Sequence, residues 1–264
     1  MQPPAVPHPY LDVDGPVAMA HRGFSTEGLE NTMRAFEAAV ALGVTHVETD
    51  VHATRDGVLV AFHDLDLDRV TDASGGIADA RWADLRGVRV GGREPIPLLE
   101  DLLGTWPELR VNIDVKDWPA VTPLVDVLRR TDAIDRVCVA SFSDRRSAAV
   151  RRAIGPRLAT SPGRRGVTRW RLAALAPGAL GARLAPRWPA GTVALQVPAA
   201  AGPLAVVTER SVRAAHAGGL QVHVWTVNDE AEMDRLLDLG IDGLISDRAD
   251  TLMQVLTRRR QQAA

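Results

Sequence analysis

The sequence predicts an α/β fold, a (β/α)8 TIM barrel with a small insertion, and three observations support this prediction. Short β-rich runs alternate with segments whose apolar residues recur at helical spacing, which is typical of a parallel sheet. About eight such units fit into the chain, and this number favours a closed barrel over an open sheet. The first strand also ends in His21-Arg22-Gly23 and lacks the glycine-rich motif of a dinucleotide-binding sheet.

Nine short runs are the predicted strands, and amphipathic helices are predicted between several of them. Gly43, Gly218, Gly219 and Gly240 stand where three of these helices are expected to end. The predicted helices cover residues 32–42, 98–103, 121–130, 144–153, 209–217 and 229–239. The predicted strands cover residues 17–21, 44–52, 58–63, 110–116, 136–142, 157–161, 192–198, 221–227 and 243–247.

Two stretches interrupt the alternation of strands and helices. Residues 65–97 are rich in Asp, Gly and Arg, and we expect an insertion at the barrel mouth, anchored by Trp82 and Leu85. Residues 163–189 contain repeated Arg, Pro and Gly and are interpreted as a mobile loop or an extra helix. We therefore expect residues 1–264 to form one barrel domain, with a flexible N-terminus over residues 1–15.

Composition argues against several classes of partner and site. The formal net charge of −2 predicts no general attraction to nucleic acid or to an anionic membrane, so anions must bind at a local site. The single cysteine, Cys138, lies in an apolar run and excludes a disulfide scaffold or a cysteine-based metal site. No apolar run is long enough to span a bilayer, and no export signal is recognisable, so the default expectation is a cytoplasmic protein.

Polar residues follow one face of two predicted strands. Alternate residues of a strand share a face, so Glu48 lies beside Asp50, and Asp114 lies beside Lys116, the only lysine of the chain. We expect this face to point into the barrel near its C-terminal mouth. Three converging carboxylates would repel one another, and a hard divalent cation such as Mg²⁺ or Ca²⁺ would neutralise them. The alternative is a set of ion pairs with arginines in the barrel.

Two histidines stand at predicted strand ends, His21 at the first and His63 at the third. Either one alone is more often a structural or a surface residue. A pair beside a cation site predicts acid and base catalysis, because histidine titrates near neutral pH.

Read in order, the motifs resemble those of the glycerophosphodiester phosphodiesterase family. Each motif is weak by itself, but the ordered set is specific and runs from the first strand to the last. The motifs are His21-Arg22-Gly23, Glu30-Asn31-Thr32, Glu48-Thr49-Asp50-Val51, Asp56-Gly57, Phe62-His63-Asp64, Ile96-Pro97-Leu98-Leu99-Glu100, Asn112-Ile113-Asp114-Val115-Lys116, Trp225-Thr226-Val227-Asn228, Gly240-Ile241-Asp242-Gly243 and Ser246-Asp247.

The resemblance implies a (β/α)8 barrel with a small insertion after the second catalytic histidine. It also implies hydrolysis of small-molecule glycerophosphodiesters to glycerol 3-phosphate and an alcohol, with a bound Mg²⁺ or Ca²⁺. By motif position, the resemblance implies that Glu48, Asp50 and Asp114 are the metal ligands. His21 and His63 would be the acid and base, and Arg22 and Lys116 would bind the phosphate. Trp225 would line the glycerol pocket.

Two positions depart from the family pattern. Asp114 stands where the family often has Glu, which bears on metal preference, and Leu29 stands where Pro is frequent. Two alternatives to the predicted function remain, a lysophospholipase D-like phosphodiesterase on the same barrel and a non-catalytic phosphate-binding barrel. The sequence specifies neither the alcohol of the substrate, nor the nucleophile, which is water or the glycerol 2-hydroxyl, nor the oligomeric state.

Overall fold

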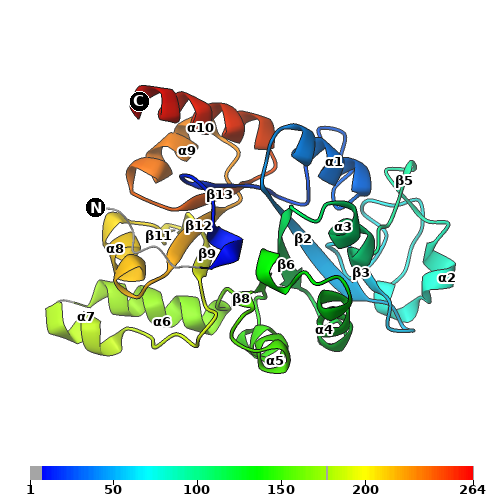
Figure 1. Ribbon diagram of the computed structural model, residues 1–264, viewed down its shortest axis with the longest axis horizontal. Coiled ribbons are helices and arrows are strands. Elements are labelled where there is room, and N and C mark those ends of the chain that lie inside the picture. The colour runs from blue at the N-terminus through cyan, green and yellow to red at the C-terminus, as the bar shows by residue number, and fades with distance from the viewer. Residues whose placement is uncertain (1–7, 177, 264) are drawn as a thin grey trace.

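Eight parallel strands form the barrel that the sequence predicts (Figure 1). The computed structural model describes residues 8–176 and 178–263. An isolated parallel bridge between Thr160 and Thr192 joins the two ends of the strand order and closes the ring. Around the ring the strands are β8 (Ala159–Thr160), β7 (Val137–Ala140), β6 (Arg110–Val115), β2 (His46–Ala53), β1 (Val17–Ala20), β13 (Gly243–Ser246), β12 (Gln221–Trp225) and β9 (Ala194–Pro198).

The predicted strand over residues 58–63 is not part of the ring. It is shortened to β3 (Leu59–Ala61), which pairs antiparallel with the end of β2. The two strands are joined by a tight turn in which Gly57 has a φ of 80° and donates its N–H to the Thr54 carbonyl. A turn this short can only reverse the chain, because a parallel neighbour needs a crossover of a dozen residues or more. His63 is therefore carried by a hairpin and not by a barrel strand.

Helices cover the outside of the ring, and those predicted from periodicity are present. Thr32 and Asp229 cap two of them, each accepting a hydrogen bond from the backbone N–H three residues on. The long C-terminal helix is additional. The stretch 163–189, expected to be a mobile loop or an extra helix, contains two helices between residues 164 and 184. The helices are α1 (Met33–Ala41), α3 (Leu99–Thr105), α4 (Val121–Arg130), α5 (Asp144–Ile154), α6 (Arg164–Leu175), α7 (Gly178–Leu184), α8 (Glu209–Ala217), α9 (Glu230–Asp238) and α10 (Ala249–Ala263).

Alternation along the strands divides the apolar residues between two layers of the barrel. On β6, Val111, Ile113 and Val115 belong to the layer between strands and helices, as predicted. On β1, Val17 and Met19 belong instead to a smaller cluster inside the ring. The apolar side chains inside the barrel therefore lie near the amino ends of the strands. The polar side chains of the site lie near the carboxyl ends of the same strands.

Residues 8–15 belong to the N-terminus expected to be flexible over residues 1–15, and they pack against the barrel. Residues 1–7 lie outside the described residues. Pro9–Leu11 form a short 3-10 helix (η1), and the side chain of Tyr10 is fully buried. Its ring packs edge-on against His46 with 5.0 Å between ring centroids, and the His46 Nε2 lies 2.8 Å from the Tyr10 carbonyl. Burial of Tyr10 and Leu11, together with hydrogen bonds from Arg110 to the Pro9 and Asp12 carbonyls, holds this segment against the barrel, which proline-rich composition alone could not indicate.

The insertion over residues 65–97 folds onto a small core of its own, at the right of Figure 1. Leu85 and Ile77 are buried there together with Phe62, and Trp82 packs against them partly exposed. Its elements are η2 (Ile77–Asp79), α2 (Trp82–Leu85), β4 (Arg89–Val90) and β5 (Glu94–Pro95). The remaining elements are η3 (Ile134–Arg136) and the hairpin of β10 (Ala200–Ala201) and β11 (Leu204–Ala205). Among the described residues, no helix is both long and apolar enough to cross a membrane.

Candidate active site

A cavity of about 240 Å³ opens at the carboxyl ends of the barrel strands. It is lined by every residue that the sequence singled out, together with the polar side chains of Asn112 and Gln196 deeper in the barrel. The predicted residues in its wall are His21, Arg22, Glu48, Asp50, His63, Asp114, Lys116 and Trp225.

The turn after β1 places His21 and Arg22 over the cavity. Arg22 has a φ of 54°, which is uncommon for a residue with a side chain, and its backbone N–H donates to Glu48 Oε2 at 3.1 Å. Gly23 follows with a φ of 80°, and a Cβ on it would lie 2.7 Å from the Ala35 carbonyl carbon in α1. The glycine of the His-Arg-Gly motif is therefore needed for the turn to pass against the helix.

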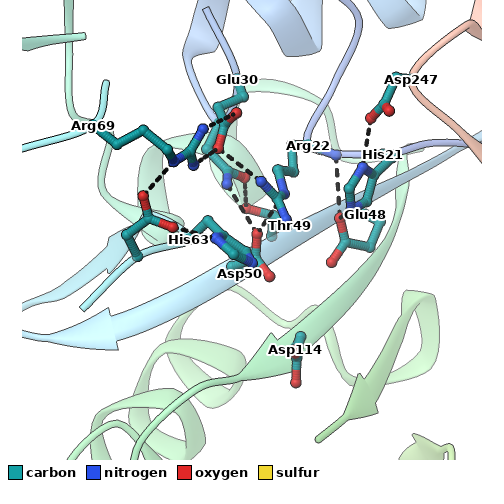
Figure 2. Close-up of polar contacts among 12 residues, drawn as sticks. His21, Arg22, Glu30, Glu48, Thr49, Asp50, His63, Arg69, Asp114 and Asp247 are labelled. Carbon is teal, nitrogen blue, oxygen red and sulfur yellow. Dashed lines mark hydrogen bonds and ion pairs between the residues drawn. The ribbon is translucent and has the colours of Figure 1, made fainter. Parts of the chain in front are cut away.

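Asp50 is the centre of the polar network, with only 2% of its side chain exposed (Figure 2). Its carboxylate lies 3.2 Å from Arg22 Nε and 2.7 Å from Lys116 Nζ. The Asn31 side-chain amide donates to the same carboxylate at 3.1 Å. Burial would raise the pKa of Asp50, but the charges of Lys116 and Arg22 prevail and hold it below its usual value.

Lys116 links Asp50 to Asp114. Its ammonium lies 3.0 Å from Asp114 Oδ2, while Asp114 Oδ1 is buried and has no hydrogen-bond partner among the described residues. Burial raises the pKa of Asp114, and the two carboxylates raise that of Lys116 despite its burial. Within residues 8–176 and 178–263, no three acidic, histidine or cysteine side chains lie close enough together to hold a metal ion.

Glu48 of β2 and His21, which follows the end of the neighbouring strand β1, lie side by side. The His21 Nδ1 lies 2.6 Å from Asp247 Oδ1, and its Nε2 lies 3.8 Å from Glu48 Oε2. Burial and the neighbouring Asp50 raise the pKa of Glu48 to about 8. Burial lowers the pKa of His21, but Glu48 and Asp247 outweigh it, so the net shift is upward.

His63 is held by contacts on both sides. Its Nδ1 lies 2.5 Å from Asp64 Oδ1, and its backbone carbonyl lies 3.1 Å from Nε2 of the buried His52. The opposite ring nitrogen of His52 is 2.8 Å from Asp117. Burial lowers the pKa of His63, and the Asp50 charge only partly offsets this.

An apolar wall faces these polar groups. The rings of Phe142 and Trp225 meet edge to face with 5.8 Å between centroids, and the Arg164 guanidinium lies 4.8 Å from the Phe142 centroid. Gly163, Arg164 and Val167, at the start of α6, complete this side. A ligand in the cavity therefore meets charge on one side and aromatic surface on the other.

Residues 21–251 match the model of the glycerophosphoryl diester phosphodiesterase family. The chain belongs to this family. The resemblance stated from the motifs is thereby confirmed. A relative from Mycobacterium tuberculosis, the probable glycerophosphodiester phosphodiesterase 2, is 42% identical over 252 residues, which are 95% of this chain and 94% of the relative.

Solved structures of similar proteins share the barrel of this phosphodiesterase family member. A putative glycerophosphoryl diester phosphodiesterase from Silicibacter pomeroyi superimposes with a TM-score of 0.78 at 22% identity, over 96% of this chain and 98% of the other. A phosphodiesterase from Oleispira antarctica, solved with the product sn-glycerol-3-phosphate, superimposes with a TM-score of 0.74 at 24% identity, over 92% of this chain and 97% of the other. Both likenesses support the predicted fold.

Several residues of the site were not assigned a task from the sequence of this phosphodiesterase. The positions of two of them could have indicated a role, because Asp64 follows His63 directly and Asp247 lies two positions beyond an inward residue of β13. Nothing in the sequence around Arg69 indicates that it belongs to the site. From the insertion it donates to Asp64 Oδ2 at 2.5 Å, and to both oxygens of Glu30 at 2.6 and 3.1 Å (Figure 2).

Arg69 ties together two parts of the site. Asp64 contacts His63, and Glu30 accepts a hydrogen bond from Arg22 Nη1 at 2.8 Å. The Arg69 guanidinium therefore spans the carboxylate partners of both His63 and Arg22. The pKa of Glu30 lies below its usual value because these arginines outweigh its burial. The sequence alone gave no reason to expect this link, because an insertion carries no strand periodicity.

Arg69→Met is expected to lower kcat/KM about 10- to 100-fold, because His63 and Arg22 both lose alignment. The pH profile should shift as well, since Asp64 is left without its arginine partner. Arg93→Met is the matched control, because Arg93 also lies in the insertion but pairs only with the exposed Glu27. Equal activity in the two variants would show that the link is only structural. Arg69→Lys should not restore activity, since one ammonium cannot span two carboxylates.

Proposed function

We propose that this protein hydrolyses small-molecule glycerophosphodiesters to glycerol 3-phosphate and an alcohol. The observation that carries the proposal is the single cavity in which two histidines, three carboxylates and two cations meet at the mouth of a barrel of this family. The names of the similar proteins support the same reaction class. A phosphodiester fits the cavity chemically, because Arg22 and Lys116 can neutralise its negative charge and Trp225 offers an apolar surface to glycerol.

The donor set fits the hard divalent cation that the family resemblance implies, Mg²⁺ or Ca²⁺. Glu48, Asp50 and Asp114 offer only oxygen atoms, and the buried Asp114 Oδ1 has no hydrogen-bond partner in the part of the chain that the structure describes. These three residues would hold the ion after their carboxylates move closer together, because in the described residues they lie too far apart to share one ion. Lys116 now occupies the space between two of them, so its ammonium would have to turn away when the ion binds. A bound ion would add positive charge beside the phosphate in the transition state.

The proposed mechanism assigns a proton transfer to each histidine. One of them removes a proton from the nucleophile, which is water or the glycerol 2-hydroxyl, and the other donates a proton to the departing alkoxide oxygen. Asp247 and Asp64 each accept a hydrogen bond from one imidazole and hold it in one orientation. Arg22, released Lys116 and the backbone around them stabilise the extra negative charge that develops on the phosphate oxygens.

A panel of glycerophosphodiesters, assayed for glycerol 3-phosphate release, tests this function. We expect turnover that is abolished by EDTA and restored by Mg²⁺ or Ca²⁺. Activity that persists at full rate in EDTA would contradict the cation. A cyclic phosphate detected by ³¹P NMR in a single turnover would identify the 2-hydroxyl as nucleophile, and its absence would favour water.

A lysophospholipase D activity is the second candidate. A mouse lysophospholipase D is 35% identical over 111 residues, which are 37% of this chain and 35% of that protein. Comparing the hydrolysis of glycerophosphocholine with that of lysophosphatidylcholine separates the two activities. If the protein bound both compounds but hydrolysed neither with any divalent cation, the result would favour a non-catalytic phosphate-binding barrel.

A further inference from the structure

The formal charge of −2 conceals an uneven distribution along the chain. Residues 145–208 contain eleven arginines and no aspartate or glutamate, so this quarter of the sequence has a formal charge of +11. It comprises most of α5 and everything from β8 to β11. The net charge excludes only a general attraction to anions, and this segment concentrates the positive charge that a local anion-binding surface requires.

The arginines of α6 and α7 have no acidic partners. Within residues 8–176 and 178–263, Arg165, Arg169 and Arg183 form no ion pair with an Asp or Glu side chain. Arginines on other surface helices differ in this respect. Arg258 and Arg259 of α10 pair with acids of α9, whereas Arg129 of α4 and Arg210 of α8 donate to backbone carbonyls. The charge on α6 and α7 is thus available to an external partner.

The same two helices expose leucines. Of the eight strongly exposed large hydrophobic side chains in the described residues, five lie in the acid-free segment, with exposed fractions between 50% and 71%. Four of them are on α6 and α7, and the fifth, Leu204, is on the hairpin whose Ala205 carbonyl accepts a hydrogen bond from Arg171 of α6. We define the α6–α7 face as Arg165, Arg169, Leu172 and Leu175 of α6 with Leu180 and Leu184 of α7.

Helical spacing explains why these residues share a surface. Arg165, Arg169 and Leu172 follow each other at intervals of four and three on the outer side of α6, while Trp170 and Ala173 are buried on the inner side. On α7, Leu180 and Leu184 are four residues apart. The two helices pack together at the lower left edge of Figure 1, where they form the margin of the molecule.

We infer that the α6–α7 face docks the protein on the surface of a bilayer that contains anionic phospholipids. Exposed leucines bury their side chains at the boundary of headgroups and acyl chains, and the surrounding arginines bind lipid phosphates. A second copy of this chain is a poorer partner, because a symmetric dimer through this face would bring two unpaired arginine surfaces together. The first residues of α6 line the cavity, so the active-site mouth lies beside the docked surface.

Flotation of the purified full-length protein with vesicles tests the docking. We expect binding to phosphatidylcholine vesicles that contain phosphatidylglycerol, little binding to phosphatidylcholine alone, and release in about 0.5 M salt, where the Debye length is only a few ångströms. Arg165→Glu with Arg169→Glu, and separately Leu180→Ser with Leu184→Ser, should each weaken binding about tenfold or more.

Matched controls change the same chemistry elsewhere on the surface. Arg55→Glu with Arg86→Glu reverses two exposed arginines outside the face, and Leu65→Ser removes an exposed leucine outside it. Both controls should bind vesicles like the unmodified protein, and all variants should keep the same circular dichroism spectrum and Tm. Hydrolysis of a water-soluble glycerophosphodiester should be unchanged in the face variants, because none of these side chains lines the cavity.

Three results would overturn the inference. One is absence of binding to anionic vesicles in low salt. Another is binding that the face variants do not weaken. The third is a preference for a different partner through the same face, seen as duplex DNA binding without vesicle binding or as self-association in analytical ultracentrifugation that the face variants abolish.

Discussion

Replacing His21 or His63 with alanine is expected to lower kcat by about 10²- to 10⁴-fold, the usual contribution of general acid or base catalysis. Each imidazole lies in the wall of the cavity with one nitrogen beside an aspartate, so its removal eliminates one proton transfer without disturbing the barrel. The double variant should be little slower than the worse single variant, because the two groups act in one reaction.

Steady-state kinetics with a glycerophosphodiester measures this loss, and circular dichroism shows whether the fold is kept. His8→Ala is the control, since His8 contacts the Arg157 carbonyl and is absent from the cavity wall. A double variant that retains full activity would end the acid and base assignment.

Asp50→Asn is expected to lower kcat about 10²- to 10³-fold and the free energy of unfolding by roughly 3 kcal/mol. The substitution removes the negative charge that faces Lys116 and Arg22 in a buried position, and it removes one proposed ligand of the divalent cation. Binding of Mg²⁺ or Ca²⁺, measured by titration calorimetry, should weaken in parallel, and urea unfolding measures the stability.

Asp242→Asn separates the two effects. Asp242 is also buried and paired, with His216 at 2.8 Å and the Val222 backbone N–H at 2.7 Å, but it does not line the cavity. We expect lost stability with retained activity and cation affinity. If Asp50→Asn behaved like Asp242→Asn, the carboxylate of Asp50 would be only a structural counter-charge.

The sequence could predict the barrel and the shared face of the strand carboxylates because both depend on short-range patterns, whereas Arg22 and Trp225 were assigned from the family resemblance. Alternation along β2 and β6 places Glu48, Asp50, Asp114 and Lys116 on one face in any parallel strand, and the observed register sets Asp50 directly opposite Asp114. No long-range information was needed to group them in one cavity.

Features that depend on contacts between distant segments could not be predicted. The burial of Tyr10 depends on space at the start of the strands, and the position of the Lys116 ammonium depends on the pocket around it. The antiparallel β3 looked like a barrel strand because periodicity gives no strand direction. Arg69 reaches the site only because the insertion folds back over it.

The two histidines are attached to different parts of the molecule. His21 follows β1, one of the eight strands of the barrel. His63 follows the hairpin of β2 and β3, which packs on the small core of the insertion. We expect this separate core to open at lower free energy than the barrel. Such an opening would displace His63 and the Arg69 link together while the barrel stays folded. Activity should then be lost on heating at a lower temperature than the one at which the barrel melts, which thermal inactivation measured beside circular dichroism checks.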